Sequence, residues 1–176
     1  MDTTGTTVRI ELVPVSASQT AVLQNLLELY AHDFSEYVPL ELRETGRFQL
    51  LLGPEWWEAE DHYPFFVRQQ GKLVGFALVR RGSRVSSEAD VMDVAEFFVL
   101  RGARRQRVGA LVVRELFRIF PGRWEARVRL GNAPALAFWA RAFAACSGRA
   151  AEVAAFSQAG VDWQVFRACA APRDEA

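Results

Sequence analysis

The chain of 176 residues is 51% hydrophobic and 24% charged, and it carries 21 basic and 21 acidic residues. This length and composition fit one globular domain with a substantial core and exclude a disordered chain. The formal net charge of zero gives no general attraction to polyanions, so neither nucleic acid nor a membrane surface is expected as a partner.

The N-terminal part is predicted to contain a tail, a strand and a helix. Residues 1–7 are polar and lack periodicity, as in a flexible tail, whereas residues 8–15 alternate apolar and polar side chains, as in a strand. Residues 16–19 supply candidate N-caps for a helix, and apolar residues then recur at helical spacing between residues 22 and 30.

The remaining chain alternates between strand and helix patterns. Prolines and glycines interrupt residues 36–61, where short helices are expected at 40–44 and 55–60. Two strands joined at Gln70-Gly71-Lys72 are expected within residues 64–81. The later predicted elements are a strand at 91–100, a helix from 107 to 120 ended by Pro121-Gly122, a strand at 122–130, a helix at 131–146, and strands at 151–156 and 161–169.

A strand, helices, three strands, a helix, a strand, a helix and two strands follow in turn. They predict an α/β (α+β) domain of order β-α-α-β-β-β-α-β-α-β-β over residues 8–170, followed by a flexible tail at 171–176. Antiparallel hairpins with interspersed helices imply a mixed, mostly antiparallel central sheet with helices on both faces.

Targeting and cysteine patterns indicate a cytoplasmic protein, either a monomer or a homodimer. The N-terminus lacks a charged and then apolar leader, and no apolar run reaches membrane-spanning length. Cys146 and Cys169 have neither metal-ligand spacing nor a second pair to form a disulfide framework. No metal is therefore expected.

An arginine-rich loop precedes the helix predicted at 107–120. In LRGARRQRVGALVV, Arg101, Arg104, Arg105 and Arg107 crowd a helix N-terminus, whose partial positive charge opposes them. A strand, a basic loop and a helix start together form a cradle for an anion such as phosphate. A bound anion would remove the conflict, and a solvated loop is the alternative.

The same loop resembles the acetyl-CoA loop of the GNAT family of N-acetyltransferases, Val-x-x-x-x-Arg/Gln-x-x-Gly-x-Gly/Ala. A second stretch, NAPALAFW, resembles the family's later Asn, Ala and aromatic motif. The resemblance covers most of the chain and is sharpest over residues 93–143. The matching positions are Val99, Arg104, Gly109, Asn132, Ala135 and Trp139.

The resemblance implies transfer of an acetyl group from acetyl-CoA directly to a primary amine acceptor. It implies that the strand before the loop binds the pantetheine arm through its backbone, that the loop binds the pyrophosphate, and that the next strand splays away to admit the thioester. The implied cofactor-binding residues are Phe97, Phe98, Val99, Arg104, Arg105, Gln106, Arg107, Val108, Gly109, Ala110, Asn132 and Trp139.

Two departures from the family pattern affect the functional prediction. Arg107 occupies the place of a glycine that lets the backbone approach the pyrophosphate. Trp139 stands where many members carry a tyrosine that protonates the leaving thiolate, and an indole cannot be that acid. Either water and the helix dipole assist the thiolate, or Tyr30, Tyr37 or Tyr63 approaches from elsewhere. A non-catalytic acyl-CoA-binding module is the alternative function.

Candidate bases and acceptor contacts complete the predicted site. The strand before the loop carries Asp93 and Glu96, whose odd separation places them on opposite faces of a regular strand unless a bulge intervenes. Either could take the proton of the amine. His62, Trp56 and Tyr30 are the candidate acceptor-binding residues, set against ordinary structural roles for each.

Overall fold

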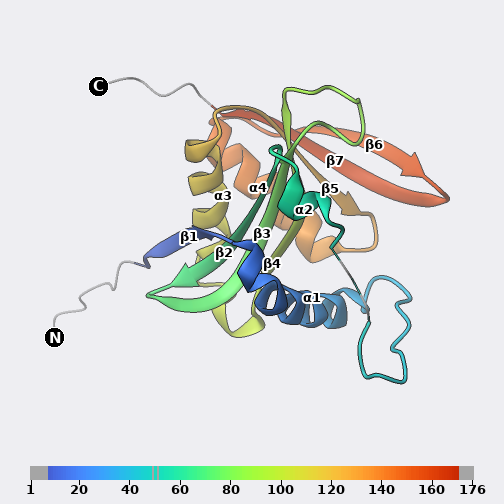
Figure 1. Ribbon diagram of the computed structural model, residues 1–176. Helices are drawn as coiled ribbons and strands as arrows, with labels where there is room; N and C mark the ends of the chain where they lie inside the picture. Colours follow the sequence, from blue (N-terminus) through green and yellow to red (C-terminus); the bar gives the residue numbers. More distant parts are fainter. Residues whose placement is uncertain (1–7, 49, 51, 171–176) are drawn as a thin grey trace, which may run out of the picture.

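The computed structural model describes residues 8–48, 50 and 52–170, and the predicted tails at 1–7 and 171–176 lie outside these residues (Figure 1). The described strands form one seven-stranded sheet in the order β1-β2-β3-β4-β5-β7-β6. The strands are β1 (Ile10–Pro14), β2 (His62–Gln69), β3 (Lys72–Arg81), β4 (Val91–Val99), β5 (Gly122–Arg129), β6 (Glu152–Gln158) and β7 (Val161–Ala170). The α-helices are α1 (Thr20–Phe34), α2 (Glu55–Glu58), α3 (Val108–Ile119) and α4 (Ala133–Ser147).

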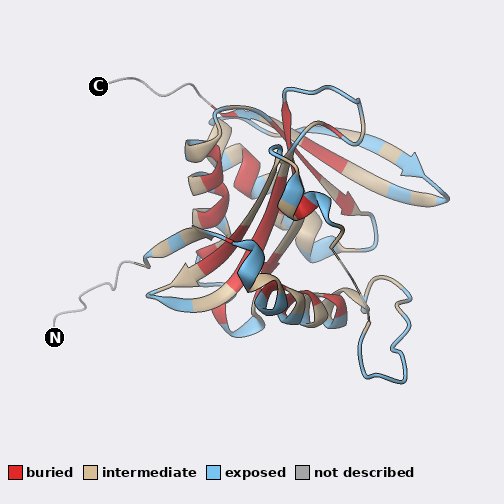
Figure 2. Cartoon of the chain, in the orientation of Figure 1, coloured by how far each residue is buried: buried red, intermediate tan, exposed pale blue. Residues whose placement is uncertain are grey.

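Helices cover both faces of the sheet, as predicted. Neighbouring strands pair antiparallel except β4 and β5, which are parallel. One apolar cluster packs α1 and α2 against β2, β3 and β4, and a larger one packs α3 and α4 against the opposite face. The buried residues run along the centres of the strands and the inner sides of the helices (Figure 2). The predicted α/β class and element order are confirmed.

The predicted helix at 40–44 is wrong. The segment instead makes a tight turn, in which the Arg43 N–H donates to the Arg47 carbonyl and the Gly46 N–H donates to the Arg43 carbonyl. Gly46 has a φ of +71°, which ends any helical run. Residues 41–47 are exposed, so no packing supports a helix too short to be stable by itself.

A bulge in β4 reverses the side-chain alternation of that strand. Leu78 of β3 pairs with Glu96, whereas the next residue, Val79, pairs with Val94, so Ala95 is the extra residue. As a result, Asp93 and Glu96 both project on the α1 side of the sheet, because their partners on β3, Arg80 and Leu78, share one face. The opposite-face arrangement of a regular strand therefore does not apply.

Strands β4 and β5 separate halfway along their length. Their parallel pairing runs from Val91 with Arg123 to Val94 with Ala126 and goes no further. The second half of β4 keeps its pairing with β3 on one edge only. Beyond the bulge, β4 therefore has an open edge, which is the splay that the resemblance implied.

Candidate active site

The N-terminus of α3 is an uncapped helix start in the arginine loop. Its N-cap residue, Arg107, has φ +65° and ψ 2° and makes no side-chain capping hydrogen bond. Arg105 also has a positive φ, of +61°. The first-turn N–H groups, from Val108 to Ala110, therefore have no side-chain acceptor at the cap and point towards the loop, as donors for an anion.

A groove of about 830 Å³ runs past this helix start between α1, β4, α3 and α4. It is lined by Tyr30, Asp33, Phe34 and Tyr37 of α1 and the residues after it, and by side chains of the arginine loop. The predicted cofactor-binding residues that line the groove are Phe97, Phe98, Val99, Arg104, Arg105, Arg107, Val108, Gly109, Ala110, Asn132 and Trp139.

Gln106 is the predicted loop residue that does not line the groove. Its amide nitrogen donates to the Gly102 carbonyl at 2.8 Å, and its amide oxygen accepts from Gln69 of β2 at 3.0 Å. These two bonds fix the outer side of the loop to the neighbouring hairpin. Gln106 thus has a structural role in this arrangement.

Asp33 of α1 holds two of the loop arginines. Arg101 Nε donates to Asp33 Oδ1 at 2.8 Å, and Arg104 makes a short hydrogen bond to Asp33 Oδ2. Arg104 Nε also donates to the Val99 carbonyl at 2.7 Å. Burial opposes the ionisation of Asp33, but the hydrogen bonds and charges of Arg104 and Arg101 lower its pKa overall. The pair of arginines is thereby tied to α1 and half neutralised.

The structure explains the glycine and the asparagine at the positions that match the two family motifs, Gly109 and Asn132. A Cβ on Gly109 would lie 3.0 Å from the Phe138 ring of α4, so the glycine lets α3 and α4 pack closely. Asn132 caps α4, its side-chain oxygen accepting from the Ala135 N–H at 3.1 Å. Trp139 is buried in the core against Phe97. Both Asn132 and Trp139 reach the groove with their edges.

The open edge of β4 presents backbone donors to the groove. The Leu100 N–H donates to the Val74 carbonyl of the neighbouring chain segment at 2.8 Å. Because donors alternate between the two edges of a strand, the N–H groups of Phe97 and Val99 face the side that β5 has left. These two donors are placed to bind a carbonyl or amide that lies along the strand.

Tyr30 and Glu96 form a hydrogen-bonded pair beside the open edge. The Tyr30 hydroxyl of α1 donates to Glu96 Oε2 at 2.6 Å. Burial raises the pKa of Glu96, partly opposed by the Tyr30 hydrogen bond and by the charges of Arg84 and Arg127. Burial and the adjacent carboxylate raise the pKa of Tyr30. The phenol stays protonated, and the carboxylate is a stronger base than an ordinary glutamate.

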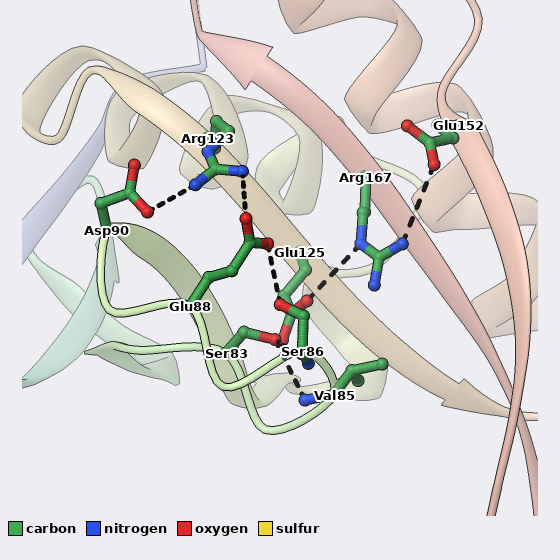
Figure 3. Close-up of polar contacts among 9 residues, drawn as sticks. All are labelled: Ser83, Val85, Ser86, Glu88, Asp90, Arg123, Glu125, Glu152 and Arg167. Atoms are coloured by element: carbon green, nitrogen blue, oxygen red, sulfur yellow. Dashed lines mark hydrogen bonds and ion pairs between the residues drawn. The ribbon is translucent and has the colours of Figure 1, made fainter.

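A row of charged residues crosses the α1 side of the sheet next to Glu96. Register places His62, Arg80, Asp93, Glu125, Arg167 and Glu152 opposite one another on six neighbouring strands. Arg80 Nε donates to Asp93 Oδ2 at 3.0 Å, and Arg167 lies between Glu125 and Glu152 (Figure 3).

Asp93 and Glu125 are fully buried members of this row. One Asp93 oxygen has no hydrogen-bond partner among the described residues, and the other is bound by Arg80. Burial raises the pKa of Glu125, against the effects of the Ser83 hydroxyl and of Arg167. Glu125 is not among the site residues predicted from the sequence. A single acid within the otherwise apolar WEA stretch of a predicted strand is the signal that indicates such a buried carboxyl.

His62 and Trp56 lie away from the groove. His62 Nδ1 is 2.7 Å from Asp61 Oδ1, and its ring makes an edge contact with Trp56 at 4.7 Å between centroids. Trp56 is buried against the α1-side core. Neither residue lines the groove, whereas Tyr30 does. The structure therefore brings one of the three candidate acceptor-binding residues to the site.

The match to a family model decides the family. Residues 23–144 match the model of the acetyltransferase (GNAT) family, which is more than half of the chain. The chain belongs to the GNAT family. No curated protein sequence matches this GNAT protein.

Solved structures share the GNAT fold at low sequence identity. An acetyltransferase from Thermus thermophilus is 14% identical, with a TM-score of 0.67 over 91% of this chain and 96% of that one. Aminoglycoside acetyltransferase AAC(6')-Ib, solved with coenzyme A and kanamycin, is 12% identical, with a TM-score of 0.66 over 92% and 95%. PaiA N-acetyltransferase from Thermoplasma acidophilum, solved with coenzyme A, is 14% identical, with a TM-score of 0.61 over 92% and 99%.

This GNAT protein shows neither a metal-binding cluster nor a membrane-spanning helix among its described residues. Within those ranges, no group of three or more histidine, cysteine, aspartate or glutamate side chains is arranged to hold a metal ion. None of the helices in that part of the chain combines the length and apolar character that crossing a membrane requires.

Proposed function

We propose that this GNAT protein transfers the acetyl group of acetyl-CoA directly to a primary amine, with Glu96 as the base. The observation that carries the proposal is the hydrogen bond from Tyr30, which lines the groove, to Glu96, which lies on β4 just past the bulge and next to the open edge. The comparisons give no support to the alternative of a non-catalytic acyl-CoA-binding module.

The groove fits coenzyme A by the chemistry of its donors. A pyrophosphate suits the first-turn N–H groups of α3, with Arg105 and Arg107 beside them. The carbonyls of a pantetheine arm suit the backbone N–H groups of Phe97 and Val99 on the open edge of β4. Bound there, acetyl-CoA supplies an activated thioester. Structures of GNAT neighbours solved with coenzyme A support this placement as a proposal.

The residues near the thioester end would carry the proton transfers. Glu96 takes the proton of the attacking amine as the new N–C bond forms, and its raised pKa favours this step. The N–H groups on the open edge of β4 stabilise the negative charge of the tetrahedral oxygen. As the C–S bond breaks, Tyr30 gives its phenolic proton to the sulfur and regains one from Glu96.

Tyr30 is the best placed of the three tyrosines for this role. Tyr63 packs against Phe120, on the side of the sheet that α3 covers, with ring centroids 4.7 Å apart. Tyr37 lines the groove beyond the end of α1, and the phenol that donates to Glu96 is that of Tyr30. The tyrosine missing at Trp139 is therefore replaced in this proposal by one from α1.

We further propose a cytoplasmic location.

The test combines cofactor binding with turnover. Calorimetry should detect coenzyme A binding, and release of free thiol from acetyl-CoA should accelerate with an amine acceptor. Glu96→Gln should keep coenzyme A binding while lowering kcat by about 100-fold or more. The matched control is Glu11→Gln, an exposed acid on β1. Absence of coenzyme A binding, or a Glu96→Gln enzyme as active as wild type, would overturn the proposal.

A further inference from the structure

Two arginines near Glu96, Arg84 and Arg127, form no ion pair with any described carboxylate. Other arginines on this side of the sheet are paired, Arg80 with Asp93 and Arg167 with both Glu125 and Glu152. The paired arginines balance the buried acids of the charged row. Arg84 and Arg127 are thus the two guanidinium groups near Glu96 that no described carboxylate holds within ion-pair distance, and the charges of both act on Glu96.

Arg127 stands directly across the strand split from Glu96. The last β4–β5 pair is Val94 with Ala126, so Arg127 is the first residue of β5 beyond the split. Glu96 is the first residue of β4 past the bulge, on the same face as Arg127. The Glu96 and Arg127 side chains therefore face each other at the point where β4 and β5 separate. Arg127 Nε is buried and has no hydrogen-bond partner among the residues described.

Arg127 and Arg129 are held in place by an aromatic ring. Their guanidinium groups each lie 5.6 Å from the ring centroid of Trp163 on β7. The α1-side apolar cluster contains no residue of β5 or β7, and the β6–β7 hairpin extends past the helices in Figure 1. This part of the sheet is thus a charged surface next to the base, without a helix packed over its apolar positions.

Arg84 approaches the same region from the loop between β3 and β4. Burial and then the charges of Arg80 and Arg127 lower the pKa of Arg84, whereas the charges of Asp93 and Glu96 raise it. Ser83, beside Arg84, fixes the loop by accepting from the N–H groups of Val85 and Ser86 at 3.0 and 2.9 Å (Figure 3). An anion bound beside Arg84 and Arg127 would relieve the mutual repulsion of their charges.

We propose that the acceptor is a small amine that carries an anionic group, a carboxylate or a phosphate, and that Arg127 and Arg84 bind this group while Glu96 faces the amine. The inference rests on the proposed function and specifies its substrate class. An amine with several positive charges and no anion is disfavoured, because it would meet the unpaired arginines.

Matched pairs of amines test the inference by binding, without need of turnover. Calorimetry on the protein saturated with coenzyme A compares alanine with alaninamide, and phosphoethanolamine with ethanolamine. The anionic member of at least one pair should bind at least about 10-fold tighter, and which pair responds distinguishes carboxylate from phosphate. Spermidine serves as the polycation. Equal binding within both pairs, no binding of any anionic member, or tighter binding of spermidine would overturn the inference.

Variants then locate the anion site. Arg127→Gln should raise the KM of the anionic acceptor by about 10- to 100-fold, the value of a charge-assisted hydrogen bond, with the KM of acetyl-CoA unchanged. Arg127→Lys should recover part of the loss. Arg9→Gln, which removes a side chain 82% exposed on the far edge of the sheet, is the control. An unchanged acceptor KM in Arg127→Gln would refute the assignment.

Failure of this inference is distinguishable from failure of the proposed function. If neutral amines are acetylated in a Glu96-dependent reaction and anionic amines are not preferred, the proposed acetyltransferase function is retained and the proposed anion site is refuted. If coenzyme A does not bind, the proposed function falls first.

Discussion

Arg107 holds a left-handed backbone conformation that costs a residue with a Cβ about 1–2 kcal/mol. A glycine would adopt the same φ of +65° without this penalty. The arginine side chain lines the groove at the uncapped helix start, where its charge suits an anion. If the groove binds coenzyme A as proposed, the gain in affinity from Arg107 offsets this loss of stability.

Arg107→Gly should therefore change stability and affinity in opposite directions. Relief of the strain should raise the free energy of unfolding by about 1 kcal/mol, or about 2–4 °C in Tm. Loss of the guanidinium should weaken coenzyme A binding by about 10-fold. Thermal denaturation and calorimetry measure the two effects. Tighter binding in the variant would mean that Arg107 obstructs the pyrophosphate.

The Tyr30–Glu96 pair makes a prediction about pH. The proposed reaction requires ionised Glu96, so kcat/KM is expected to fall as the pH drops through the pKa of Glu96, which burial raises above that of an ordinary glutamate. The Tyr30 hydrogen bond lowers this pKa, so Tyr30→Phe should move the acidic limb of the profile to higher pH. It should also lower kcat by about 100-fold.

Tyr63→Phe is the matched control, because it removes a phenol on the opposite face of the sheet. Its pH profile should coincide with that of the wild type. An acidic limb of Tyr30→Phe that stays in place would show that the phenol does not act on Glu96.

At the scale of elements, the site depends on how β4 is held between β3 and the open edge. Gly75 of β3 lies so close to β4 that a Cβ there would be 2.0 Å from the Phe98 carbonyl oxygen. The glycine allows this approach in the stretch of β4 whose other edge faces the groove. The packing of β3 therefore fixes the position of the backbone donors.

Gly75→Ala should destabilise the protein by about 3 kcal/mol, because backbone must move to admit the methyl group. Gly71→Ala is the matched control: Gly71 has φ +76° and open space around it, so its cost is conformational strain of about 1 kcal/mol. Urea denaturation compares the two variants. Equal losses would show that close approach at Gly75 does not limit the fold.

At the scale of the whole molecule, the order of helices and strands could be predicted because each has its own hydrophobic periodicity and its own start and stop residues. The Asn132 cap and the stop at Pro121-Gly122 are local signals of this kind. The bulge at Ala95 and the charged row were not predictable, because both depend on register between strands that only the folded sheet defines. The left-handed conformation of Arg107 is not indicated by an arginine, and the one sign of it in the sequence is that the family pattern has a glycine at this position.

Asp33 connects helix α1, which carries Tyr30, to the arginine loop, because its carboxylate accepts hydrogen bonds from Arg101 and Arg104. The ion pairs leave less positive charge for an incoming pyrophosphate, so a ligand must compete with the carboxylate for these arginines.

Asp33→Asn should therefore tighten coenzyme A binding several-fold, and the gain should shrink between about 50 and about 300 mM salt because the added attraction is screened. Calorimetry at both salt concentrations measures it. Glu11→Gln, on the exposed face of β1, changes net charge equally and should have no such effect. Weaker binding in Asp33→Asn would show instead that Asp33 orients the arginines for the cofactor, so that α1 and the loop form one preorganised site rather than two competing partners.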